Sequence, residues 1–181
     1  MSFEAYKRWR HTRGYGVHSP FAFRVVKEII RVAGRYTYYG YDPIEEKAEK
    51  SGKKEYLKSA LMLLRIAARL DVGSVLMKGG PMKDLFREAL RQADSKIKIT
   101  KEIDGVNLCR MAIGHKDNLP LDVLRRFVSL PGKIIFLTDA PEGWREKLFD
   151  EMEEGVMFYG KRNVLLISRL GMQKIKYSIL M

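Results

Sequence analysis

The sequence has only one cysteine, Cys109, among its 181 residues. One thiol cannot form an intramolecular disulfide, and the three histidines make no cluster with it at metal-ligand spacing. A chain without disulfides is typical of a reducing compartment. The scarcity of cysteine therefore excludes a disulfide-stapled scaffold, and we expect no metal site.

Long apolar runs are lacking as well. The longest, such as residues 134–137, are far too short to cross a bilayer. The first residues, MSFEAYKRWRHTRG, are too charged for the apolar core of a signal peptide. We therefore expect a cytoplasmic protein with no membrane partner. Low-complexity tracts and repeats are absent too, and a hydrophobic content of 46% argues for one domain with a proper core.

Acidic side chains are outnumbered, with 22 Asp and Glu against 34 Lys and Arg and a formal net charge of +12. Such an excess suits nucleic acid or an anionic metabolite, or it simply keeps a small protein soluble. Basic side chains surround Tyr6, Trp9 and Tyr15 near the N-terminus, a mixture able to grip phosphates and stack on bases. The alternative, which we favour, is an arm whose aromatic rings dock on the domain while its charges stay solvated.

The stretch that organises the chain is residues 72–93, VGSVLMKGGPMKDLFREALRQA. It predicts a strand at residues 74–77, a turn at Gly79 and Gly80, and a helix with Pro81 in its first turn. A β-turn-α unit is the usual opening of a doubly wound α/β domain. The glycine pair completes no nucleotide-binding motif. The predicted inner face of the helix comprises Met82, Leu85, Phe86, Ala89, Leu90 and Ala93.

Two further helices are predicted before this unit. Ser19 is a suitable N-cap with Pro20 at the first helical position, and this helix should run to Gly34. A second helix should span residues 54–70, with Arg65 facing water. Between them, the tyrosines of residues 36–41 form a loop that could line a substrate or pack on the core, and the charged residues 44–52 form a short exposed helix or a linker.

Two acidic residues follow predicted strands. Residues 96–103 alternate as a half-exposed strand that ends near Glu102. An acid there can accept hydrogen bonds from ribose hydroxyls, or it belongs to a turn. Residues 133–138, KIIFLT, read as a buried strand. Asp139, which follows, either meets a ligand in the crevice or caps the next helix, and capping is the commoner role.

At the C-terminal end, residues 163–168 and 174–180 read as strands joined by a hairpin-like connection. The pattern predicts an α/β fold with a Rossmann-like sheet, helices on both faces and antiparallel C-terminal strands. We expect residues 1–52 to be a helical, aromatic extension and residues 53–181 to be the α/β domain.

Residues 14–21, GYGVHSPF, match the motif G-[FHY]-G-[IV]-H-S-P-F. On this motif the chain resembles the class I S-adenosylmethionine-dependent methyltransferases, in particular a bacterial group that opens with it. A tyrosine-containing loop, a helix rich in Leu and Arg, and a strand with a Gly-rich turn follow in that group, as residues 36–41, 58–67 and 72–80 do here. Residues 164–180 resemble the antiparallel last strands of the fold.

The resemblance implies S-adenosylmethionine as cofactor and a small-molecule substrate. Gly79 and Gly80 would approach the cofactor, Glu102 would bind its ribose, and Asp139 would face the substrate; no catalytic residue is assigned. Where the family reads I-L-E-I-G-T, residues 75–80 read VLMKGG.

Met77 thus replaces the family's acid, and Lys78 adds a positive charge near the place of the sulfonium. Residues 102–133 are also short for the helices and strands expected there, which points to the absence of one strand-helix unit. We therefore expect a divergent methyltransferase-like protein with an eroded cofactor site. The alternative is a noncatalytic basic module that binds nucleic acid or an acidic protein partner.

Overall fold

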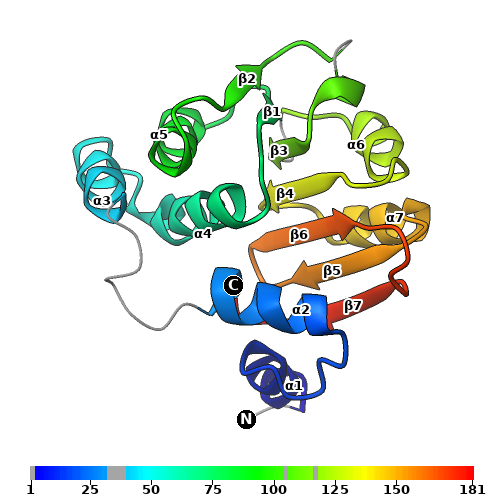
Figure 1. The fold of residues 1–181 in the computed structure, drawn as a ribbon. Coiled ribbons are helices and arrows are strands. Elements are labelled where there is room, and N and C mark those ends of the chain that lie inside the picture. Colours follow the sequence, from blue (N-terminus) through cyan, green and yellow to red (C-terminus); the bar gives the residue numbers. More distant parts are fainter. Residues whose placement is uncertain (1–2, 32–39, 104–105, 116–117) are drawn as a thin grey trace.

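The computed structural model describes residues 3–31, 40–103, 106–115 and 118–181. Within this part of the chain, seven strands form one mixed sheet in the order β2-β1-β3-β4-β6-β5-β7. Helices cover both faces of the sheet (Figure 1). The predicted α/β class is confirmed, and the architecture is consistent with a Rossmann-like fold in general.

The first four strands along the chain are mutually parallel, and the C-terminal strands mix both directions. β6 runs antiparallel to its neighbours β4 and β5, and β7 is parallel to β5. The strand bounds are β1 Ser74–Met77, β2 Lys98–Thr100, β3 Met111–His115, β4 Ile134–Thr138, β5 Gly155–Tyr159, β6 Asn163–Ser168 and β7 Ile175–Ser178.

The helices of the described residues are mostly short. A π-helical turn, Val26–Ile30, continues α2, and 3-10 turns at Lys54–Tyr56 and Val106–Leu108 precede α4 and β3. The α-helices are α1 Phe3–Thr12, α2 Pro20–Val25, α3 Tyr41–Lys50, α4 Leu57–Arg69, α5 Lys83–Ala93, α6 Leu121–Val128 and α7 Glu142–Glu151.

The core has two layers, one on each face of the sheet. Val75 and Met77 of β1 contribute to the layer shared with α4 and α5, whereas Leu76 contributes to the layer shared with α6 and α7. Successive strand residues face opposite sides, so a central strand covered on both faces is apolar throughout. Val25 and Ile44, from the expected N-terminal extension, lie in the α4 layer.

The central unit forms as predicted. β1 ends at Met77, and Gly79 and Gly80 make the turn with φ values of 68° and 101°. The helix begins at Lys83 rather than at Pro81, which lies in the turn. The predicted inner face is buried at Met82, Leu85, Phe86, Ala89 and Leu90.

The segments before β1 differ from the prediction at two places. The side chain of Ser19 caps α2 as predicted, but the regular helix ends at Val25 and continues as the π-helical turn. Of the two alternatives for residues 44–52, the helix is present, as α3 over residues 41–50, but its Ile44 and Ala48 are buried rather than exposed. The end expected at Gly34 and most of the tyrosine loop, residues 36–39, lie outside the described residues.

Arg65 of α4 does not face water. It is only 9% exposed, and its guanidinium donates to the carbonyl of Ile29 at 2.6 Å and to the hydroxyl of Tyr41 at 2.8 Å. Helical periodicity predicts that Arg65 faces water, but the N-terminal helices pack over this side of α4. A buried charge needs such partners, so Arg65 joins the N-terminal helices to α4.

The N-terminal arm docks through its polar side chains, whereas the prediction had its aromatic rings dock and its charges stay solvated. α1 lies against β7 through polar groups: Arg8 donates to the Ser178 hydroxyl at 2.9 Å, and the His11 ring contacts the Ser178 carbonyl at 3.1 Å. Phe3 is 78% exposed and Trp9 37% exposed. The aromatic rings of α1 therefore remain on the surface.

The C-terminal hairpin prediction is wrong. β6 and β7 exist close to the predicted places, but they do not pair, because β5 lies between them. The hairpin is instead β5–β6, with Val156 opposite Ile167. β5 joins the sheet at an interior position and is buried from Gly155 to Phe158, so it shows no alternating pattern.

Candidate functional site

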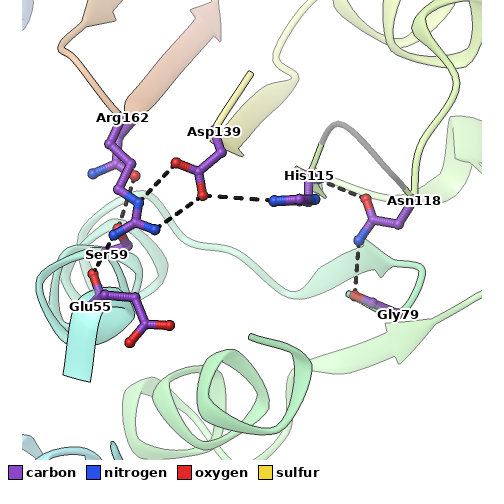
Figure 2. Close-up of polar contacts among 8 residues, drawn as sticks. Glu55, Ser59, Gly79, His115, Asn118, Asp139 and Arg162 are labelled. Carbon is purple, nitrogen blue, oxygen red and sulfur yellow. Dashed lines mark hydrogen bonds and ion pairs between the residues drawn. The ribbon is translucent and has the colours of Figure 1, made fainter. Parts of the chain in front are cut away.

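The strand order creates a switch point between β1 and β3. β1 pairs with β2 on one side and with β3 on the other. The chain therefore runs from β1 outward to β2 and then crosses back past β1 to form β3. Ligands of open α/β sheets bind at the carboxyl ends of the strands beside such a point. The loops after β1, β3 and β4 meet there, together with the start of β6 (Figure 2).

Asp139 forms the centre of this edge. Its Oδ1 accepts a hydrogen bond from Nε of Arg162 at 2.9 Å, and its Oδ2 accepts one from Nη2 at 3.3 Å (Figure 2). The backbone N–H of Asp139 also donates to the Arg162 carbonyl at 2.8 Å. A two-point guanidinium–carboxylate contact fixes both groups in orientation, so Asp139 and the β5–β6 turn are tied together.

The prediction that Asp139 caps the following helix is wrong. α7 begins after Pro141, and no side chain caps it. Asp139 instead has a φ of 52°, in the left-handed region. Non-glycine residues in that region are uncommon and cluster at functional or tightly constrained sites. Here the ties to Arg162 hold the backbone in place.

Arg162 is held from two further directions. Its Nη1 donates to the Glu55 carbonyl at 2.9 Å, and its guanidinium lies 4.5 Å above the Tyr56 ring. The hydrogen bond to the Asp139 carboxylate raises the pKa of Arg162. Burial, followed by the charge of Asp139, raises the pKa of the Tyr56 hydroxyl. Arg162 is therefore held by the Asp139 carboxylate, the Glu55 carbonyl and the Tyr56 ring together.

His115, the last residue of β3, is 5% exposed. Its Nε2 lies 3.7 Å from Oδ2 of Asp139, which is too long for a hydrogen bond. A histidine beside a carboxylate can act in proton transfer when the two are hydrogen-bonded and a substrate reaches the ring. The distance and the burial of His115 provide neither condition here.

Asn118 crosses the switch point. Its Oδ1 accepts from the backbone N–H of His115 at 2.7 Å, and its Nδ2 donates to the carbonyl of Gly79 at 2.9 Å (Figure 2). A Cβ added to Gly80 would lie 2.7 Å from that Nδ2, whereas one added to Gly79 would meet nothing within 4 Å. Asn118 therefore fills the space beside Gly80, and only Gly79 keeps an open approach.

The other predicted cofactor residue lies apart from this network. Glu102 follows β2 and is exposed, and its backbone N–H donates to the Thr100 hydroxyl at 3.2 Å. Its carboxylate makes no ion pair within the described part of the chain. Met77, where the resembled family has an acid, is buried in the core layer of α5, and Lys78 is exposed.

A row of polar side chains underlies the edge. His115, Thr138 and Asn163 are neighbours across β3, β4 and β6, and Ser59 of α4 donates to Oδ1 of Asn163 at 2.9 Å. The buried hydroxyl of Thr138 has no hydrogen-bond partner among the described residues. Buried polar atoms are nearly always paired, so this edge is a polar floor with unmet hydrogen-bonding capacity.

The sequence predicts Gly79 and Asp139, which lie at this edge, but not the residues that connect them. His115 and Asn118 carry a usable signal, because they follow an apolar strand, MAIGH, at the edge where ligands bind. Arg162 and Tyr56 have no such signal in the sequence around them. They reach the site through a hairpin turn and a helix start whose proximity depends on the whole sheet.

The arrangement is better suited to holding loops than to chemistry. Asp139 and Arg162 neutralise each other, and a carboxylate that already accepts two guanidinium hydrogen bonds is a poor general base. Within the described residues, no group of three or more His, Cys, Asp or Glu could hold a metal ion. The residues also do not fit S-adenosylmethionine as the resembled family holds it, because Met77 replaces the acid and Asn118 occupies the space beside Gly80.

Comparisons with family models, curated proteins and solved structures returned no significant match to this chain. Among the helices of the described residues, none has the length and apolar character needed to span a membrane. The geometry of the carboxyl edge and the sequence motif therefore carry the functional argument.

Proposed function

We propose that this chain is a divergent protein of the class I methyltransferase type that neither binds S-adenosylmethionine nor transfers a methyl group. The GYGVHSPF motif and the antiparallel β6 beside β4 support the relationship. Between β2 and β3, the described residues contain one 3-10 turn, Val106–Leu108. That short connection supports the loss of one strand-helix unit.

The main support for a lost cofactor site is Asn118, whose side chain connects His115 to Gly79. A cofactor at the switch point needs close approach to the backbone of the glycine turn. Asn118 already binds the Gly79 carbonyl and fills the space beside Gly80. Methyl transfer depends mainly on positioning, so a chain that cannot seat the cofactor has no route to the reaction.

Calorimetry with S-adenosylmethionine and S-adenosylhomocysteine tests the proposal. We expect no saturable heat and no thermal shift at millimolar ligand. Glu102→Ala is the matched variant, because Glu102 is exposed and its substitution should leave the fold intact. Saturable binding by the natural chain that Glu102→Ala weakens would show that the predicted ribose contact operates and that the crevice is open.

A second function, binding of single-stranded nucleic acid, is favoured by the surface of α1. Tyr6 and Trp9 are exposed and stack on each other at 6.1 Å. The guanidinium of Arg13 lies 4.2 Å above Trp9, and that of Arg10 lies 6.0 Å from the Tyr6 ring centre. Exposed rings flanked by cations provide stacking and phosphate contacts together.

Mobility shifts with RNA and DNA oligonucleotides over a salt series test this second function. We expect affinity to fall steeply with salt and to drop about tenfold in Trp9→Ala, since stacking contributes roughly 1–3 kcal/mol per base. Leu108→Ala, at an exposed apolar residue before β3, is the control. Salt-independent binding, or equal loss in both variants, would remove this function.

A further inference from the structure

A cavity of about 710 Å³ opens at the edge of the sheet opposite to the Asp139 network. It lies beside Arg110 and Ile134, at the amino ends of β3 and β4, and its walls come from α2, the end of α4 and the end of β6. Small-molecule sites are typically concavities of roughly 300–1,000 Å³. The cavity is therefore large enough for a metabolite.

The lining of this cavity is strongly basic. It includes Arg24, Arg69, Arg110 and Arg169 against a single acid, Glu28. Among the described residues, Arg24, Arg110 and Arg169 make no salt bridge with an acid. Three arginines outside the cavity, Arg125, Arg126 and Arg162, each meet a carboxylate. Converging cations repel one another, so an anion between them would be stabilised.

The local structure makes room for one of these guanidinium groups and orients another. Gly132 has a φ of 75°, and a Cβ there would lie 2.5 Å from Nη1 of Arg110. Glycine thus allows the Arg110 guanidinium to lie directly against this loop. The guanidinium of Arg169 lies 4.3 Å above the ring of Phe21. Stacking of this kind orients the planar group before any ligand arrives.

The floor of the cavity is apolar. Val25, Ile29 and Ile134 line it and belong to the hydrophobic core. A ligand that matches both parts has an anionic group and an apolar body. A guanidinium binds phosphate and carboxylate oxygens with paired hydrogen bonds, and aliphatic side chains bury a ring or chain.

We propose that this cavity is a binding site for a small organic anion, a phosphate monoester or carboxylate with an apolar body. The anionic group lies between Arg24, Arg110 and Arg169, and the body rests on Val25, Ile29 and Ile134. The site is separate from the carboxyl edge and from α1, so it rests on neither proposed function. Its concave shape and size suit one metabolite rather than a nucleic acid strand.

Titration calorimetry with phenyl phosphate tests the proposal, with inorganic phosphate and phenol as the two partial probes. We expect saturable binding of phenyl phosphate that is about tenfold tighter than that of either partial probe. Arg24→Gln and Arg110→Gln should each weaken it by roughly tenfold. Arg91→Gln makes the same charge change on α5, outside the cavity, and should leave binding unchanged.

Thermal unfolding of each variant establishes that it is folded before binding is compared. If one of the two cavity variants does not fold, the other still tests the site. Equal weakening by Arg91→Gln and by the cavity variants would indicate general attraction to a basic protein and overturn the site. Absence of saturable binding by every probe at millimolar concentration would also overturn it. Binding of phenol alone as tightly as phenyl phosphate would contradict the role of the arginines.

Discussion

At Asp139 two effects that usually oppose stability are combined in one residue. The backbone lies in the left-handed region, and the carboxylate is partly withdrawn from water, with 30% of the side chain exposed. Arg162 offsets both, since it binds the two carboxylate oxygens and accepts the backbone N–H of Asp139. Asp139 thus stabilises the edge of the sheet, and its carboxylate is not available as a base.

This balance predicts the effect of substitutions at Asp139. Asp139→Ala should lower the free energy of unfolding by about 2 kcal/mol, because alanine tolerates a positive φ poorly and the ion pair is lost. Asp139→Asn should lose about 1 kcal/mol, since asparagine tolerates that backbone and keeps a polar contact. Urea unfolding measures both values.

The control for this comparison is Asp122→Ala on α6. Asp122 makes an exposed pair with Arg126, and such pairs contribute little. We expect a change within about 0.5 kcal/mol. An Asp139→Ala variant as stable as Asp122→Ala would contradict the structural role of the Asp139 network.

At the scale of elements, Arg65 connects the N-terminal helices to α4. Arg65→Met keeps most of the side-chain volume but removes the two buried hydrogen bonds that the guanidinium donates, to the Ile29 carbonyl and to the Tyr41 hydroxyl. We expect a loss of about 2–3 kcal/mol in the free energy of unfolding, because hydrogen bonds from a charged donor each contribute roughly 1.5–3 kcal/mol. Lys58→Met, at an exposed position of the same helix, should change stability by less than about 0.5 kcal/mol. Equal losses in the two variants would contradict the anchoring role.

The docking of α1 should depend on pH through His11. Burial is the main cause that lowers the pKa of His11, with Lys7 and Arg10 adding to it against the opposing Ser178 carbonyl. The folded chain therefore takes up a proton at lower pH than the unfolded chain does. The His11 contribution to stability is complete above the unfolded pKa of about 6.5 and is lost as pH falls towards the folded value.

The measurement is thermal unfolding between neutral and mildly acidic pH for the natural chain and for His11→Asn, which does not titrate. The difference between the two profiles isolates His11 from the carboxylates. We expect the natural chain to lose more stability on acidification than the variant does. Parallel profiles, or a gain for the natural chain, would contradict the burial of a neutral His11 against β7.

At the scale of the whole molecule, the sequence predicted those elements whose pattern is local. The run KIIFLT, the Ser19–Pro20 helix start and the β-turn-α unit each identify themselves within a few residues, and each is present. β5 was missed because its short run, GVMFY, follows the acidic helix α7 after only a few residues, so it was not separated from that helix. Which strand pairs with which is a non-local property, so the order of the C-terminal strands could not be predicted.

The candidate site follows the same rule. Gly79 and Asp139 could be predicted because they follow strands whose ends meet at one edge of the sheet. Arg162, Tyr56 and Asn118 reach that edge from other elements, and their contacts decide what the edge can do. The arginine cavity could not be predicted from the sequence for the same reason, since its cations come from separate elements.

Our central proposal is that the Asn118 side chain, beside Gly80, keeps S-adenosylmethionine out of the switch point. Nuclear magnetic resonance of the isotope-labelled protein, titrated with S-adenosylhomocysteine, tests it most directly. The reporters are the backbone amides of Gly79, Gly80 and His115 and the side-chain amide of Asn118. We predict that none of these signals moves at millimolar ligand. Saturable shifts of these signals, above all of the Asn118 side-chain amide, would show that the contacts of Asn118 open and would contradict the account.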